Sequence, residues 1–128
     1  MTEAQLLIGL MSYVVFLFST TCHEAAHAWA AHRLEDDTAY LLGHVTLDPT
    51  PHIKREPIGM VAVPLISLLL GGWMIGWASV PYNPNWAQRW PKRCALMAMA
   101  GPAANFTLVL VAVILMKIGI AAGVFEVA

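Results

Sequence analysis

Three long apolar runs, separated by two polar stretches, make up most of this chain of 128 residues. A membrane-spanning helix needs about 20 predominantly apolar residues, which each run supplies. The pattern therefore predicts an all-α integral membrane protein, a single membrane-embedded domain with about three transmembrane helices. The expected elements are a helix over 4–31, a polar loop over 32–57, a helix over 58–80, a connector over 81–93, a helix over 94–117 and a tail over 118–128.

Two of these segments carry a further signal. Residues 38–47 are rich in β-forming residues around a glycine, which predicts a β-hairpin or an extended strand in the short polar loop. The prolines of residues 48–51 are expected to break any regular element at that point. In the second apolar run, Pro64 and the pair Gly71-Gly72 interrupt the helical pattern, so we expect one kinked helix or two half-helices.

Composition supports a membrane protein over a soluble one. Hydrophobic residues make up 59% of the chain and charged residues 12%, whereas ordinary globular domains have about 25% charged residues. The seven Lys and Arg are dispersed and the formal net charge is -1, which argues against nucleic acid as a partner. The chain begins without the basic segment of a secretory signal, so the first run is expected to remain as a transmembrane helix. Cys22 and Cys94 are expected to be free thiols.

The first apolar run ends in the pattern His-Glu-x-x-His, formed by His23, Glu24 and His27. Residues four apart lie on one face of a helix, so the two imidazoles can bind a single ion. Glu24 points about 100° away around the helix, which would place its carboxylate beside a metal-bound water. Zinc hydrolases use this arrangement, with the glutamate as general base. The pattern also arises by chance, but ionisable groups on an apolar helix are costly in a bilayer, which favours a zinc site.

A polar residue, Asn105, lies within the third apolar run, shortly after Gly101 and Pro102. At membrane depth an asparagine side chain can make an interhelical hydrogen bond. It can also belong to the active site, where its amide would steady a developing oxyanion. The sequence leaves both roles open for Asn105.

With these motifs in order, the chain resembles the site-2 protease family of intramembrane zinc metalloproteases, specifically its small bacterial-type members. The resemblance implies Zn²⁺ held by His23 and His27, Glu24 as the base, and hydrolysis of transmembrane protein substrates within the lipid bilayer of a bacterial cell. It runs nearly end to end and rests on residues 23–28, 37–39, 43–49, 52–53, 76–78, 80–84 and 100–105.

One motif of the family has no counterpart here. The resemblance implies a third zinc ligand, an aspartate in an Asn-Pro…Leu-Asp-Gly motif on a further transmembrane helix, and no such motif follows Asn105. Either the chain is a truncated piece of a longer protein, or the third ligand comes from elsewhere. The candidates in this chain are His32, His44, Asp48 and His52.

Two other function classes compete with the protease. A catalytically inactive relative or fragment, acting as a membrane binding or scaffold subunit, is the alternative, because two histidines leave catalytic zinc one protein ligand short of the usual three. A haem-binding bundle is disfavoured because His23 and His27 share one helix face. For a protease, an extended segment near Val45 is a candidate to pair with an unwound substrate strand.

Overall fold

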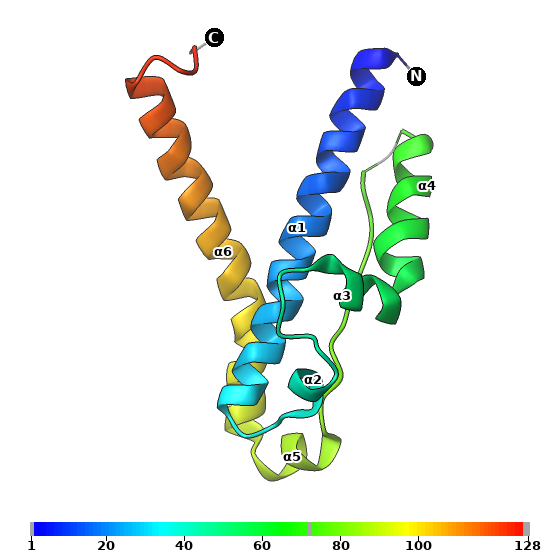
Figure 1. The fold of residues 1–128 in the computed structure, drawn as a ribbon, viewed down its shortest axis with the longest axis vertical. Helices are drawn as coiled ribbons and strands as arrows, with labels where there is room; N and C mark the ends of the chain where they lie inside the picture. Colours follow the sequence, from blue (N-terminus) through cyan, green and yellow to red (C-terminus); the bar gives the residue numbers. More distant parts are fainter. Residues whose placement is uncertain (1, 72, 127–128) are drawn as a thin grey trace.

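The computed structural model describes residues 2–71 and 73–126. Two helices of 31 residues each form its frame, α1 (Glu3–Arg33) and α6 (Pro91–Ala121). Figure 1 shows that they lie together where α1 ends and α6 begins, and that they separate toward the two termini. They occupy the first and third apolar runs, as predicted, and extend a few residues beyond the expected bounds.

Local sequence accounts for where these helices begin. The Thr2 hydroxyl accepts a hydrogen bond from the Gln5 amide (3.1 Å), and the Gln5 side chain accepts one from the Thr2 amide (2.9 Å), which is a reciprocal helix cap. At the other end of α1, Glu35 adopts a left-handed φ of 78°, which turns the chain away from the helix. Helix α6 begins at Pro91. Proline suits the first helical position because the amide that it lacks would have no partner within the helix.

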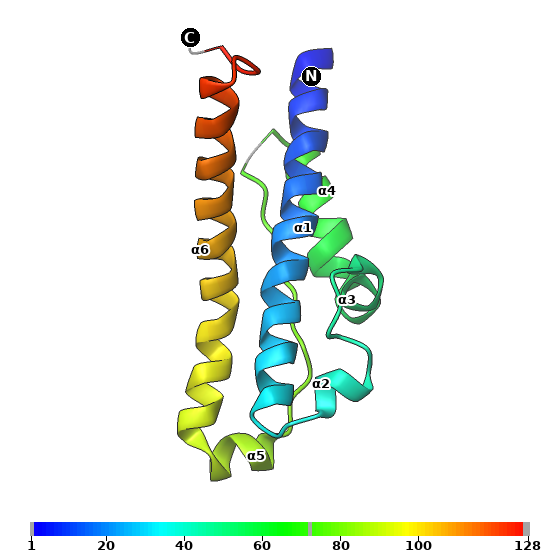
Figure 2. The same cartoon turned by 60° about the vertical axis from the view of Figure 1, so that its left-hand side comes forward.

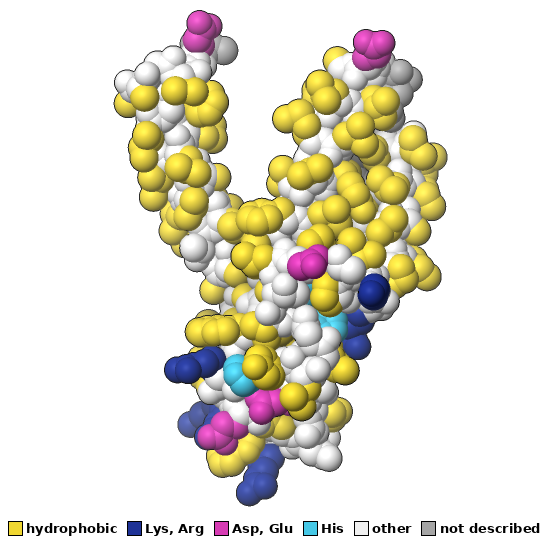
Figure 3. All heavy atoms as spheres, in the orientation of Figure 1, with side chains coloured by type: hydrophobic (Ala, Val, Ile, Leu, Met, Phe, Trp, Pro, Cys, Tyr) yellow, Lys and Arg dark blue, Asp and Glu magenta, His cyan; other side chains and the backbone are white. Residues whose placement is uncertain are grey.

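Both long helices are apolar and long enough to cross a membrane, and they are the two helices of that kind among the described residues. Their large apolar side chains are mostly exposed, as in Leu7, Val15 and Leu110. Figure 3 shows apolar side chains over both separated arms, whereas most charged side chains gather in the lower half. Exposed apolar surface of this extent is what a bilayer would cover.

The second apolar run differs from the helix predicted over 58–80. A π-helical turn, η1 (Ile58–Ala62), continues into α4 (Val63–Leu69), and together they are too short to span a bilayer. Gly71 then takes a φ of 73°, and residues 73–83 return without helical structure. Figures 1 and 2 show this segment passing alongside α1. The third transmembrane helix is therefore not seen in the described part of the chain.

The polar loop is helical where a hairpin was predicted. It forms two short helices, α2 (Thr38–Leu41) and α3 (Pro49–Arg55), and the described residues contain no strand. Asp48 caps α3, since its carboxylate accepts a hydrogen bond from the Thr50 amide (2.9 Å). The proline-containing segment thus begins a helix, because proline fits the first turn.

The protein core lies where the ends of the long helices meet. Trp86 of α5 (Pro84–Arg89) is buried there and donates its indole N–H to the Leu34 carbonyl at the end of α1 (2.9 Å). Asp36, only 4% exposed, accepts hydrogen bonds from Thr38 Oγ1 (2.6 Å) and from the Asn83 amide (2.9 Å). These contacts fasten the polar loop and the connector to α1. The buried apolar residues that pack into two clusters there are Ala28, Ala30, Ala31, Ala39, Val80, Trp86 and Met97.

The hydroxyl of Thr21 on α1 is buried without a partner in the described part of the chain, and this leads to a prediction about stability. Thr21 is 1% exposed, and its hydroxyl has no hydrogen-bond partner among the described residues. Burying an unpaired hydroxyl costs about 1–3 kcal/mol, and valine has nearly the same shape. We expect Thr21→Val to raise the free energy of unfolding by about 1 kcal/mol. Thr21→Ala should lower it instead because it leaves a cavity. Thermal unfolding in detergent measures both, and equal effects of the two substitutions would contradict the argument.

Candidate metal centre

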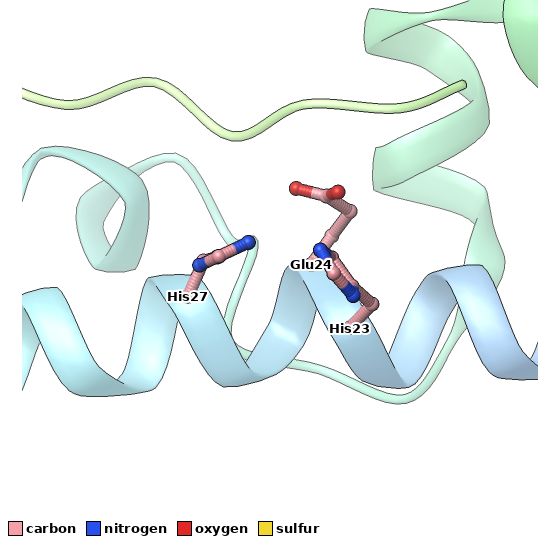
Figure 4. Close-up of side chains that lie close together, drawn as sticks. All are labelled: His23, Glu24 and His27. Atoms are coloured by element: carbon pink, nitrogen blue, oxygen red, sulfur yellow. The ribbon is translucent and has the colours of Figure 1, made fainter. Parts of the chain in front are cut away.

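Three side chains of α1 gather at its buried end. His23, Glu24 and His27 each offer one ligand atom, and these atoms lie within 4.8 Å of one another. The two imidazole rings are 4.6 Å apart between centroids and nearly perpendicular. Glu24 is 6% exposed. Figure 4 shows the three side chains extending from one side of α1 toward the extended segment that follows α4.

Helix α6 holds both imidazoles through their Nδ1 atoms. His23 Nδ1 bonds to Asn105 Oδ1, and His27 Nδ1 bonds to the Met97 carbonyl oxygen (2.7 Å). Both oxygens can only accept, so each Nδ1 carries the proton and each Nε2 keeps its lone pair. A hydrogen-bond acceptor on one ring nitrogen is the usual way in which proteins orient a metal-binding histidine.

The orientation of the Asn105 amide is itself fixed. Its Nδ2 donates to the Ser19 carbonyl oxygen (3.1 Å) and to the Ser19 hydroxyl (2.8 Å) on α1. The carbonyl of Ser19 accepts only, so Asn105 Oδ1 must face His23. The interhelical hydrogen bond, one of the two roles open from the sequence, is present; the oxyanion role stays a prediction.

Gly101 brings the backbone of α6 directly against the two imidazoles. A Cβ atom at this position would lie 2.5 Å from His23 Nε2 and 2.6 Å from His27 Cε1. Any side chain would therefore press on the nitrogens that remain free for a ligand. The donor set, its tautomers and this cradle fit a zinc ion bound through both Nε2 atoms.

A cavity of about 330 Å³ adjoins this cluster. Its far wall is the extended segment, which is pinned by a hydrogen bond from the Trp77 amide to the Gly59 carbonyl of η1 (3.0 Å). Gly76 packs closely there, since a Cβ would lie 2.6 Å from the same carbonyl oxygen. The sequence indicated these residues only through the family resemblance. The lining residues are Ser19, Thr20, His23, Glu24, Gly76, Trp77, Ala78 and Asn105.

Comparison with known proteins decides the family. The chain is 35% identical over 104 residues to "Putative zinc metalloprotease YwhC" of Bacillus subtilis, and the match covers 79% of this chain and 43% of that protein. It is 31% identical over 101 residues to "Putative zinc metalloprotease Rip2" of Mycobacterium tuberculosis, covering 79% of this chain and 38% of the relative. The chain belongs to the site-2 protease family. This confirms the resemblance seen in the sequence.

The similarity covers only part of the length of these relatives. The chain spans about two fifths of the length of these curated relatives, 43% and 38%. The Rip2 relative of Mycolicibacterium smegmatis is 29% identical over 103 residues and is covered to the same extent, 38%. No family model matches the chain, and no solved structure matches it.

In this site-2 protease relative, the alternative third ligands lie outside the His23, Glu24 and His27 cluster. His32 bonds to Asp37 (2.6 Å) and stacks on Tyr40. The Nδ1 atoms of His44 and His52 lie 3.5 Å apart. Burial, the neighbouring His52 and the charge of Arg55 lower the pKa of His44. Asp48 caps α3, and hydrogen bonds from Thr50 lower its pKa.

Proposed function

We propose that this chain carries the zinc-binding and general-base residues of an intramembrane zinc metalloendopeptidase, acting on membrane-spanning proteins in a bacterial cell membrane. One observation carries the proposal. Both imidazoles of the His-Glu-x-x-His motif are held through Nδ1 by α6, which leaves both Nε2 atoms for one ion beside a buried glutamate.

His23 and His27 would hold Zn²⁺ through their Nε2 atoms. When bound, zinc supplies Lewis acidity, which polarises a carbonyl and lowers the pKa of water to about 7. Catalytic zinc sites use three protein ligands, so a further donor is required beside the two imidazoles. Membership of the site-2 protease family implies an aspartate on a later helix for this role.

Glu24 would act as the general base. Its carboxylate lies on the same side of α1 as the two imidazoles and is nearly buried. In this role it accepts a proton from the attacking water and later delivers that proton to the leaving amine. Burial keeps bulk water from competing for the proton during the transfer.

Asn105 would position His23 for this chemistry. Replacing Asn105 by leucine removes the acceptor on His23 Nδ1 and the two bonds to Ser19. We expect zinc affinity to fall by about 10–100-fold, the usual effect of losing a hydrogen-bond partner of a metal-binding histidine. Zinc titration of the purified variant measures this. Asn85→Leu, at an exposed position of α5, is the control and should bind zinc as the parent does.

The extended segment would bind the substrate backbone. A helical peptide bond is shielded, so the substrate must unwind before cleavage. Among the described residues 73–80, only the Trp77 amide donates a hydrogen bond to a backbone carbonyl, that of Gly59. The remaining amides leave an edge to which an unwound strand can add. Val45, the candidate for this role from the sequence, lies in a bend and not in an extended segment.

A proline at position 78 tests this backbone role, because it removes the amide next to the Trp77 anchor. We expect Ala78→Pro to lower kcat/KM by roughly tenfold or more, while zinc content stays unchanged. Ala78→Ser keeps the amide and serves as the control. Equal cleavage by the two variants would count against strand addition.

Cleavage of a membrane-spanning reporter in liposomes tests the proposed function as a whole. We expect cuts within the membrane span, mapped by mass spectrometry, that stop when zinc is chelated and resume when zinc is restored. A reporter that binds but stays intact with zinc supplied would favour the alternative, an inactive binding subunit.

A further inference from the structure

A second pair of histidines does not belong to the cluster on α1. His44 follows the turn at Gly43, where φ is 81°, and His52 belongs to α3. Both are buried, with 5% and 0% exposure. Their Nδ1 atoms face each other at 3.5 Å, and the ring planes make an angle of 66°.

This separation is long for a hydrogen bond and is close to an ordinary van der Waals contact. Hydrogen bonds from ring nitrogens normally measure about 2.7–3.2 Å between heavy atoms. Two nitrogens bound to one tetrahedral zinc, each at about 2.0–2.1 Å, lie about 3.4 Å apart. The observed 3.5 Å between His44 Nδ1 and His52 Nδ1 matches the second value.

The protonation of His52 also suits a ligand. Its Nε2 faces the Thr46 carbonyl oxygen at 3.2 Å, and that oxygen can only accept. The proton therefore belongs on Nε2, and Nδ1 presents its lone pair toward His44. Helix α6 orients the imidazoles of α1 in the same way, with a carbonyl oxygen that accepts a hydrogen bond from one ring nitrogen.

The surroundings leave room for further ligands. His44 borders an open pocket of about 650 Å³, and Asp48 lines the same pocket. Water or this carboxylate can complete the coordination shell. Lys54 and Arg55 also line the pocket and oppose a cation, so neutral imidazoles must supply most of the binding. Imidazole ligands favour borderline-soft divalent ions such as Zn²⁺, Co²⁺ and Ni²⁺.

We propose that His44 and His52 form a second binding site for a divalent transition-metal ion, which fastens the turn at residues 42–48 to α3. The site shares no ligand with the proposed catalytic centre and does not depend on peptidase activity. Its expected effect is structural, since it cross-links two parts of the polar loop that packs against α1.

Cobalt titration of a variant lacking the α1 histidines tests this site. With His23→Ala and His27→Ala combined, and without a histidine purification tag, we expect saturation at one Co²⁺ per chain. Adding His44→Gln or His52→Gln should weaken binding by about tenfold or more. Glutamine at position 52 keeps a donor for Thr46, so packing is largely preserved. Adding His32→Gln, the matched control, should leave binding unchanged.

Two outcomes of this titration would overturn the proposal. The first is that the variant without the α1 histidines binds no cobalt. The second is that cobalt binds equally well after both glutamine substitutions.

Hydrogen exchange of the unaltered chain provides a second measurement that does not require the α1 variants to fold. We expect cobalt to slow exchange of amides in residues 44–52, and to lose this effect in His52→Gln. If cobalt does not change the exchange rates of these amides in the unaltered chain, the two histidines are only in packing contact.

Discussion

Replacing Glu24 by glutamine is expected to lower peptide-bond cleavage by about 10²–10⁴-fold, the usual contribution of a general base. Glutamine has the same shape but cannot accept the proton from water. The imidazoles of His23 and His27 and their contacts to α6 are untouched, so zinc content should stay at the parent level. Cleavage of a membrane-spanning reporter and zinc per chain are measured on the same preparation.

Glu35→Gln is the matched control for this experiment. Glu35 lies beyond the end of α1, largely exposed, and pairs with Arg93 at 3.2 Å. We expect its activity to equal that of the parent. Glu24→Gln that cleaves as fast as Glu35→Gln would remove Glu24 from the mechanism, whereas loss of zinc in Glu24→Gln would make it a ligand instead of a base.

Substituting Gly101 by alanine is expected to lower zinc affinity by about 10–100-fold. The added Cβ would lie 2.5 Å from His23 Nε2. The imidazoles cannot turn away without losing Asn105 Oδ1 and the Met97 carbonyl. Overpacking costs about 1–3 kcal/mol, whereas glycine to alanine in a helix returns up to about 1 kcal/mol. The net effect on stability should therefore be a loss on the order of 1 kcal/mol.

Helix α6 offers its own control in Gly119→Ala. The atoms nearest to a Cβ there belong to the ring of Phe125, which is 54% exposed and near the end of the described chain. The ring can move aside, so we expect unchanged zinc binding and a small gain in stability. Zinc titration and thermal unfolding compare the two variants. Equal zinc affinity in both variants would show that the small size of Gly101 is not needed for the imidazoles to bind zinc.

The long helices could be predicted because charge-free apolar runs of this length, without a Gly-Gly pair inside them, have few alternatives. The second run could not, because its composition also suits an extended segment buried against a helix. Its path depends on contacts between distant residues, such as Gly76 against Phe16 and the Gly59 carbonyl. Such close approach follows from packing, which local sequence does not encode.

The polar loop shows local bonds overriding β propensity. Asp36 accepts two hydrogen bonds from Thr38, and Tyr40 stacks on His32 at 4.1 Å between ring centroids. These contacts hold residues 38–41 as a helical turn against α1. Strand propensity depends on a neighbouring strand to pair with, and the loop has none among the described residues.

The metal cluster was predictable because its three residues are local to one helix. Its outer contacts were less so. For Asn105 the sequence left two roles open. The Met97 contact is made by a backbone carbonyl, which no residue type in the sequence can indicate. The pairing of His44 with His52 depends on the fold of the loop. The sequence could therefore only indicate each of them separately, as a candidate third zinc ligand.

The zinc content of the chain tests the central claim most directly. It is best measured with His52→Gln present, so that α1 supplies the histidine pair under test. After titration with zinc and removal of excess, we predict about one zinc per chain, and little after adding His27→Ala. Equal zinc with and without His27, or none in either chain, would contradict a metal centre built on His23 and His27.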